Sequence, residues 1–184
     1  MGILGGNDSY YTGRECYRFA ERLIREGREI LIVSPYIDEY YARFLSDNSG
    51  GKRIRIISSS MDQKARKLLG KGRPLGALLY ALVIILALDY LAYREGVFSA
   101  MLALLSAAIF LLGLAVFASK KKDIEIRTPV EFVHAKMYIN EREAIHGSAN
   151  LTYNGMHRNV EQIEMIRESG KVERLREEFF RLWR

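Results

Sequence analysis

The sequence has a single cysteine and no apolar leader, and each of these features excludes some classes of protein. Cys16 is the only cysteine among 184 residues, so an intrachain disulfide and a metal cluster built from cysteines are excluded. A reducing compartment agrees with this, and we expect Cys16 to serve as a small buried apolar side chain. Residues 1–30 are polar and charged without an apolar core, so no cleavable signal peptide is expected.

Charge is almost absent from the middle of the chain. Residues 76–93 contain one charged residue in 18, and residues 97–119 contain none in 23. As helices these segments would be about 27 and 35 Å long, one slightly shorter and one slightly longer than the ~30 Å thickness of the hydrocarbon core of a bilayer. A pair of core helices is the alternative, but the surrounding domain is too small to cover two helices that are apolar on every side. We therefore predict two transmembrane helices, joined at residues 94–96 into an antiparallel hairpin.

Basic residues flank the predicted hairpin on both sides. Five Lys and Arg residues lie between residues 64 and 73 and three lysines at 120–122, whereas the turn has one Arg beside one Glu. The positive-inside bias therefore predicts that both polar segments are cytoplasmic. Asp89 lies near the outer end of the first span. We interpret it as an interfacial residue that water reaches, with a proton or ion site as the alternative.

The polar segments carry a surplus of positive charge. Outside residues 76–119, 27 basic and 20 acidic residues leave a formal charge of +7. This surplus suits a polyanionic partner, which is either nucleic acid or an anionic bilayer surface. The sequence contains no recognised DNA-reading motif and no aromatic-basic RNA signature, so charge alone does not identify the partner.

The two polar segments are predicted to form one α/β domain. Apolar spacing predicts helices over residues 14–26, 38–45, 61–69 and 172–183, and strands over residues 29–33, 53–57, 124–126, 133–139, 144–146 and 162–166. Alternating strands and helices, followed by a cluster of strands and a closing helix, imply a single α/β sandwich. We expect residues 1–74 and 120–184 to build this domain together, with residues 75–119 inserted as the transmembrane hairpin.

Polar side chains two residues apart mark the candidate site. His134 and Lys136 lie on the strand predicted at residues 133–139, so their side chains project to the same face. Ser148 and Asn150 have the same spacing in the following segment. Such groups can converge on one anion, because an imidazole can attack phosphorus while lysine, hydroxyl and amide groups hold its oxygens.

This pattern resembles the H-x-K-x4-D and G-S-x-N motif of the phospholipase D superfamily. The residues that match it in order and spacing are His134, Lys136, Gly147, Ser148 and Asn150. Residues 32–37, which follow a helix, also resemble the family's first strand, and the resemblance implies the family's mixed-sheet sandwich. Glu141 replaces the motif Asp, and five residues rather than six separate it from Gly147. That acid is mainly structural in the family, so we expect the geometry to survive.

The resemblance implies hydrolysis that needs neither a metal ion nor another cofactor. His134 would be the nucleophile that forms a phosphohistidine intermediate, and a second copy of this histidine would protonate the leaving oxygen. Lys136, Ser148 and Asn150 would hold the phosphate oxygens. Glu161 would accept a hydrogen bond from the nucleophilic histidine and so orient it.

The motif occurs once, because neither His146 nor His157 is followed by lysine two residues later. Small bacterial nucleases of the superfamily also carry one motif and pair two subunits across a shared active site. The resemblance therefore favours a membrane-integrated nuclease that cleaves DNA or RNA as a homodimer. A phospholipase or phosphatidyltransferase acting on membrane lipid is one alternative, favoured by the bilayer anchor. A non-catalytic anion-binding scaffold is another, and the intact motif disfavours it.

Overall fold

The structure is a computed structural model that describes residues 8–70, 75–94, 105–111, 113 and 123–184. The chain divides into two compact units. The first unit consists of Met1–Gly70 and Lys122–Arg184, and the second of Lys71–Lys121. The first unit thus combines the two polar segments, and the second contains the apolar segment between them.

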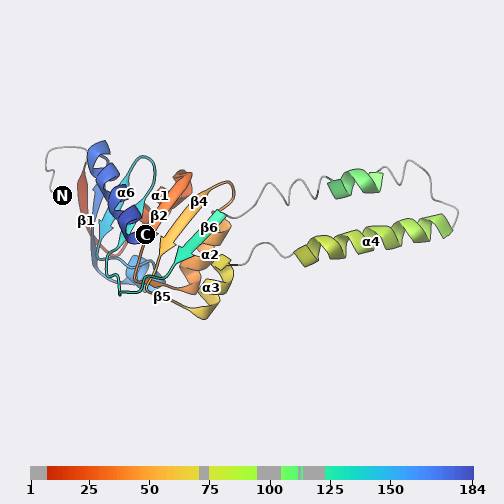
Figure 1. Ribbon diagram of the computed structural model, residues 1–184, viewed down its shortest axis with the longest axis horizontal. Coiled ribbons are helices and arrows are strands. Elements are labelled where there is room, and N and C mark those ends of the chain that lie inside the picture. Colours follow the sequence, from red (N-terminus) through yellow and green to blue (C-terminus); the bar gives the residue numbers. More distant parts are fainter. Residues whose placement is uncertain (1–7, 71–74, 95–104, 112, 114–122) are drawn as a thin grey trace. The chain divides into compact units, whose positions relative to one another are not determined.

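The described part of the first unit contains a seven-stranded sheet (Figure 1). In spatial order its strands are β1 (Ser9–Gly13), β9 (Glu161–Ile166), β8 (Ala144–Gly147), β7 (Met137–Ile139), β2 (Glu29–Val33), β4 (Arg53–Ile57) and β6 (Asp123–Arg127). Strands β2, β4 and β6 are parallel, whereas β7, β8, β9 and β1 pair antiparallel. Two short strands, β3 (Tyr36–Ile37) and β5 (Ser60–Met61), form a separate parallel pair. The predicted α/β fold with a mixed sheet is confirmed.

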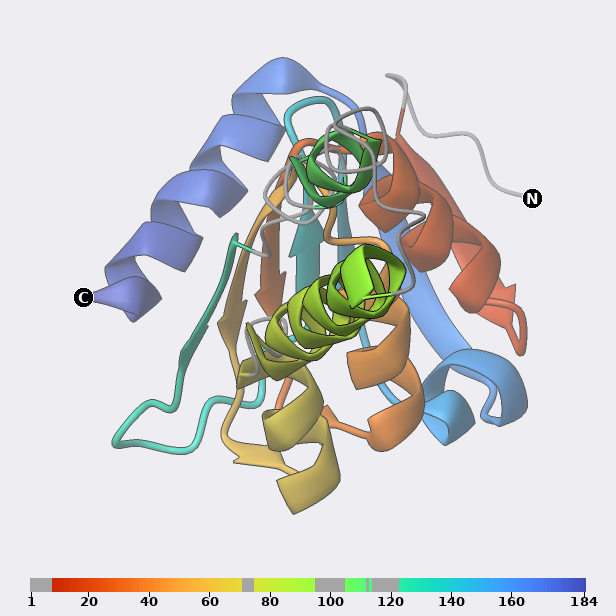
Figure 2. The ribbon, with the colours of Figure 1, turned by 90° about the vertical axis from the view of Figure 1, so that its right-hand side faces the viewer.

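Helices cover both faces of this sheet. The helices of the first unit are α1 (Tyr17–Glu26), α2 (Glu39–Asp47), α3 (Gln63–Gly70) and α6 (Ser169–Trp183). Figure 2 shows α6 on one side of the strands and α1 and α2 on the other. Along β2, Ile30 and Ile32 are buried in the core under α1, whereas Leu31 and Val33 are buried under α6. A parallel strand that is buried on both faces has a continuous apolar run, which explains this sequence. Cys16 is buried in the first of these cores, as predicted.

The second unit contains α4 (Leu75–Arg94) and a further helical stretch at residues 105–111. The Ser106 hydroxyl donates a hydrogen bond of 2.9 Å to the carboxylate of Asp89. Among the described residues, no helix is both long enough and apolar enough to cross a membrane. The structure therefore does not support the predicted transmembrane hairpin. Most of its turn and of its second span lie outside the described residues.

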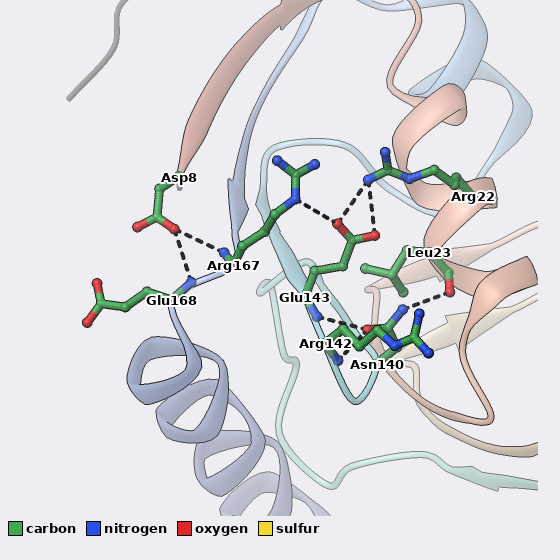
Figure 3. Close-up of polar contacts among 8 residues, drawn as sticks. All are labelled: Asp8, Arg22, Leu23, Asn140, Arg142, Glu143, Arg167 and Glu168. Atoms are coloured by element: carbon green, nitrogen blue, oxygen red, sulfur yellow. Dashed lines mark hydrogen bonds and ion pairs between the residues drawn. The ribbon is translucent and has the colours of Figure 1, made fainter. Parts of the chain in front are cut away.

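The hairpin between β7 and β8 is held by the buried side chain of Asn140 (Figure 3). Its oxygen accepts hydrogen bonds from the backbone N–H groups of Arg142 at 2.8 Å and Glu143 at 2.9 Å. Its nitrogen donates to the carbonyl oxygen of Leu23 in α1 at 3.1 Å. These contacts fix the far end of β7, the strand that begins directly after residues 134–136.

A buried carboxylate joins the β7–β8 hairpin to α1 and to the segment after β9 (Figure 3). The carboxylate of Glu143 is nearly buried and accepts from the guanidinium groups of Arg22 at 2.9 Å and Arg167 at 3.3 Å. Arg22 belongs to α1, and Arg167 follows β9. Asp8 accepts from the backbone N–H of Arg167 at 3.0 Å, so the start of the chain's first strand joins this network.

Glu141, which stands in the place of the motif Asp, has a structural position. Its carboxylate accepts hydrogen bonds from the backbone N–H groups of Arg28 at 2.6 Å and Glu29 at 3.0 Å. Partial burial opposes ionisation, but these backbone donors outweigh it and lower the pKa of Glu141. The acid thus anchors the start of β2 at the end of the sheet remote from His134.

Candidate active site

His134 and Lys136 lie in the segment that enters β7, and not within the strand. The strand predicted at residues 133–139 is observed only over Met137–Ile139. The reason lies at Val133, whose N–H donates at 2.9 Å to the side-chain oxygen of Ser59 and not to a neighbouring strand. The start of the segment that carries His134 and Lys136 is therefore held by the loop that joins β4 to β5.

The side chains of His134 and Lys136 nevertheless converge as predicted. Lys136 Nζ lies 3.0 Å from Nε2 and 3.2 Å from Nδ1 of His134, and it donates to the carbonyl oxygen of His134 at 2.8 Å. A neutral imidazole has one acceptor nitrogen, so the ammonium can donate to one of the two ring nitrogens. An anionic phosphate is a stronger acceptor than this nitrogen. Binding of a phosphate would draw the ammonium away and leave the nitrogen lone pair free for attack.

Lys136 is almost buried although His134 beside it is exposed. Only 7% of Lys136 is accessible to solvent. Burial disfavours the charged ammonium and lowers the pKa of Lys136, and the negative charge of Glu161 partly restores it. The site therefore places a poorly hydrated cation next to an accessible imidazole, which suits the binding of an anion.

Ser148 and Glu161 are bonded to each other between the ends of β8 and β9. The Ser148 hydroxyl donates to one oxygen of the Glu161 carboxylate and accepts from the backbone N–H of Gln162 at 3.0 Å. Asn159 donates to the other carboxylate oxygen at 3.1 Å. None of the described hydrogen bonds joins Glu161 to His134, so the predicted direct contact between them is not made here. The sequence prediction also missed Asn159, because its role depends on this tertiary contact.

Asn150 brings an unused hydrogen-bonding atom to the site. Its side-chain oxygen is buried and, among the described residues, has no hydrogen-bond partner. This oxygen is an acceptor, so only a donor such as water or a protonated ligand atom can satisfy it, whereas the amide nitrogen of Asn150 is the atom that can donate to a phosphate. Gly155 allows the following loop to pack against the backbone of Asn150, since a Cβ at position 155 would lie 2.6 Å from the backbone carbonyl oxygen of Asn150.

Gly147 is required where the motif places it. A Cβ at this position would lie 2.1 Å from the backbone carbonyl oxygen of Gln162 in β9, so any larger residue would push the two strands apart. This close approach brings Ser148 within reach of Glu161. The close approach of β8 to β9 therefore explains why the motif has a glycine directly before its serine.

His146 is paired with Glu164 and not with His134 or Lys136. Its Nε2 lies 2.8 Å from the carboxylate of Glu164 on β9. With Tyr10, Gly147, Ser148 and their β9 neighbours, these two residues line an open hollow of about 230 Å³. Within the described residues, no group of three or more His, Cys, Asp or Glu side chains is placed to hold a metal ion.

Comparison with known families assigns the fold. The family described as Cardiolipin synthase, PLD-like domain, matches residues 21–183, which is most of the chain. The chain belongs to this phospholipase D-like family. The resemblance drawn from the motif is therefore confirmed, together with the enzyme class, a phosphodiesterase of the phospholipase D superfamily.

Solved structures share the fold of this phospholipase D-like domain at low sequence identity. NucT from Helicobacter pylori is 12% identical with a TM-score of 0.56, and 96% of this chain covers 95% of that one. Nuc from Salmonella typhimurium, a phospholipase D family member, is 16% identical with a TM-score of 0.53 and the same coverage. Phosphatidylserine synthase from Haemophilus influenzae is 14% identical with a TM-score of 0.50, and the match spans 40% of its length. Comparison with curated protein sequences gives no match.

The electrostatics of the phospholipase D-like site predict an unusual alkaline limit. If Lys136 must be charged to hold phosphate, activity is lost as the pH rises through its pKa. Because burial lowers that pKa, the alkaline limb of kcat/KM should lie below pH 10.5, the ordinary value for lysine. Glu161→Gln removes the charge that raises this pKa, so the limb should move to a still lower pH. The measurement is a pH profile on a small phosphodiester.

A matched variant separates this effect from a general loss of charge. Glu164→Gln removes a carboxylate from the same strand, where it contacts His146 and not Lys136. Its alkaline limb should stay at the position found for the unmodified protein. An alkaline limb in Glu161→Gln at an equal or higher pH would contradict the assigned coupling between Glu161 and Lys136.

Proposed function

We propose that the protein is a metal-independent nuclease that hydrolyses nucleic acid through a phosphohistidine at His134. The observation that carries this proposal is the convergence of the Lys136 ammonium, at 3.0 Å, on a ring nitrogen of His134. The side-chain amide nitrogen of Asn150, which is a donor, and the hydroxyl of Ser148 lie on the adjoining segment. Together these groups supply a nucleophile, a cation and polar groups for one phosphate.

The proposed reaction has two steps that use the same histidine. A ring nitrogen of His134 attacks phosphorus, a P–N bond forms, and the bond to the leaving oxygen breaks while a second histidine protonates that oxygen. Water then attacks phosphorus and gives a proton to the second histidine, and cleavage of the P–N bond frees His134. Lys136 stabilises the negative charge on the non-bridging oxygens in both steps. This sequence of proton transfers needs no metal ion and no cofactor.

We propose that the second histidine is His134 of another copy of the chain, in a twofold homodimer. The motif occurs once in the sequence, so one chain cannot provide both histidines from this motif. The size of the chain supports the same assembly. It matches NucT and Nuc over 95% of their lengths, whereas it spans only 40% of phosphatidylserine synthase.

We propose that the Lys71–Lys121 unit attaches the enzyme to a membrane, with the catalytic domain in the cytoplasm. The support is the near absence of charge in residues 76–119 and the basic residues on both flanks. The hydrogen bond between Asp89 and Ser106 is a contact that packs one helix against another in such a hairpin. A cysteine introduced at Gly96 should react with an impermeant reagent only from outside the cell. Complete release of the protein by alkaline washing of membranes would contradict the attachment.

A phospholipase D or phosphatidyltransferase is the second candidate. The name of the matching family includes cardiolipin synthase, and the likeness to phosphatidylserine synthase reaches a TM-score of 0.50. The same phosphohistidine chemistry would then transfer a phosphatidyl group. Attachment to a membrane would place lipid headgroups close to the site.

Cleavage assays on the detergent-solubilised full chain distinguish the two candidates. Labelled single- and double-stranded DNA and RNA, and vesicles of anionic phospholipid, are each incubated with the protein in EDTA. We expect nucleic acid to be cleaved and lipid to be left intact. Lipid turnover without cleavage of nucleic acid would favour the second candidate, and activity that EDTA abolishes would contradict the metal-independent mechanism.

A further inference from the structure

The loop between Asn150 and Glu161 leaves the candidate active site and returns to it. Its middle forms η1 (Asn154–Arg158), a single turn of π-helix that lies beside α2 (Figure 2). Turns of π-helix are rare in proteins and often occur at functional sites. The conformation of η1 determines where the ring of Tyr153 and the last two side chains of the turn are placed.

Three aromatic rings and one guanidinium form a continuous stack at this loop. The ring of His157 lies between Tyr17, at 4.2 Å and 13°, and Tyr153, at 4.7 Å and 19°. The guanidinium of Arg158 lies 5.4 Å from the centroid of the Tyr153 ring. Because His157 covers one face of Tyr153, the guanidinium covers the other and ends the stack.

The stack is anchored inside the domain and open at its outer end. In the middle of the stack, Nε2 of His157 lies 3.2 Å from the hydroxyl of the buried Tyr41. At the outer end, 39% of Tyr153 is accessible to solvent and Arg158 is exposed. Tyr40, which is 45% accessible, meets the Tyr153 ring edge-on at 5.2 Å. Core packing accounts for His157 but does not account for two exposed tyrosines beside an exposed arginine.

The open end of the stack is close to the phosphate position along the chain. Tyr153 follows Asn150 by three residues, and its N–H donates at 2.6 Å to Asp38, at the start of α2. Arg158 directly precedes Asn159, which is hydrogen-bonded to Glu161. The loop thus joins the stack to Asn150 at one end and, through Asn159, to Glu161 at the other.

We propose that an unpaired base of a single-stranded nucleic acid stacks on the open face of the Arg158 guanidinium, at the end of the stack that Tyr153 supports and Tyr40 borders, while the neighbouring phosphate is held at His134. Aromatic rings and guanidinium planes stack on every type of base, so the contact tolerates any sequence. The charge of Arg158 also suits a strand of phosphates. A base inside a duplex is already stacked and paired, so the site selects single strands. This inference rests on the proposed nuclease function and specifies its substrate.

Binding of two matched probes tests the stack. The full chain with His134→Ala is titrated against a labelled thymidine oligomer of about twelve nucleotides and against the same length of abasic backbone. Loss of the bases should weaken binding by about tenfold, the usual effect of one stacked base. Adding Tyr153→Leu or Arg158→Gln should reduce this difference to less than about threefold.

A tyrosine outside the stack provides the matched control. Tyr10 is 47% accessible and lies on β1, where it lines the hollow beside His146 and has no described ring contact with the stack. Tyr10→Leu should retain the tenfold preference for the strand with bases. If Tyr153→Leu also retains it, or weakens binding of both probes equally, the stack does not bind a base. Arg158→Gln changes an exposed side chain, so it tests the same contact even if Tyr153→Leu fails to fold.

Failure of the proposed nuclease function gives a different pattern. Cleavage of lipid alone, with neither probe bound, would overturn both the function and the inference. Cleavage of nucleic acid with equal binding of duplex and single strand would overturn the inference and leave the function in place. Tight binding of the single strand together with loss of the base effect in Arg158→Gln supports both.

Discussion

His134→Ala is expected to reduce phosphodiester hydrolysis by roughly four orders of magnitude or more, because it removes the atom that attacks phosphorus. Among the described residues, no other side chain is hydrogen-bonded to Lys136 and could take the place of this nitrogen. The loss should fall on kcat and should be equally large for nucleic acid and for a small phosphodiester. The measurement is steady-state hydrolysis of both substrates in EDTA.

His146→Ala is the matched control for this variant. His146 is a histidine of the same sheet, one strand away, and its partner is Glu164 rather than Lys136. Activity within about threefold of the unmodified enzyme is expected, since its replacement leaves the phosphate site intact. If His134→Ala retained more than about one hundredth of the activity, another nucleophile would have to be sought.

Mixtures of unmodified chains with His134→Ala chains should show that one active site uses two subunits. When the altered chain is co-expressed in about nine-fold excess, most unmodified chains pair with an altered one. Such a pair has only one of the two histidines that the reaction needs. Activity per unmodified chain should therefore fall by about tenfold.

The same excess of an altered chain has no effect if each subunit works alone. Unchanged activity per unmodified chain would therefore contradict the shared site. As a control, His146→Ala chains mixed in the same proportion should leave the activity of each unmodified chain as it was. Cross-linking of the mixture before the assay confirms that mixed pairs have formed.

Parts of the fold were predicted to the residue because burial leaves a clear pattern. The strands predicted at residues 29–33 and 53–57 match β2, whose apolar run is buried on both faces, and β4, in which buried isoleucines alternate with arginines. The edge strand β1 was missed. Its sequence Ser9–Gly13 alternates between half-buried and exposed positions and has no apolar run. Edge strands of this kind carry little periodic signal, so only their pairing partner identifies them.

The site was predicted as a set of residues but not as a set of contacts. The motif located His134, Lys136 and Ser148, and the structure brings the first two together. The motif could not show that Glu161 binds Ser148 and Asn159, because this depends on how β8 and β9 pair. The stack was missed for a similar reason. Tyr153 and His157 are four residues apart, but the third ring, Tyr17, comes from α1, so no local pattern relates the whole stack.

Pairing of the first strand with the last also determines when a growing chain can become active. Among the described strands β1 pairs with β9 alone, and β6 joins β4 after the Lys71–Lys121 unit. Every candidate catalytic residue, from His134 to Glu161, follows that unit in the sequence. Since domains fold as their residues emerge during translation, a nascent chain holds no phosphodiesterase site until the segment that contains β9 leaves the ribosome. A nuclease with this strand order would be unable to cut the message that encodes it until β9 has been synthesised.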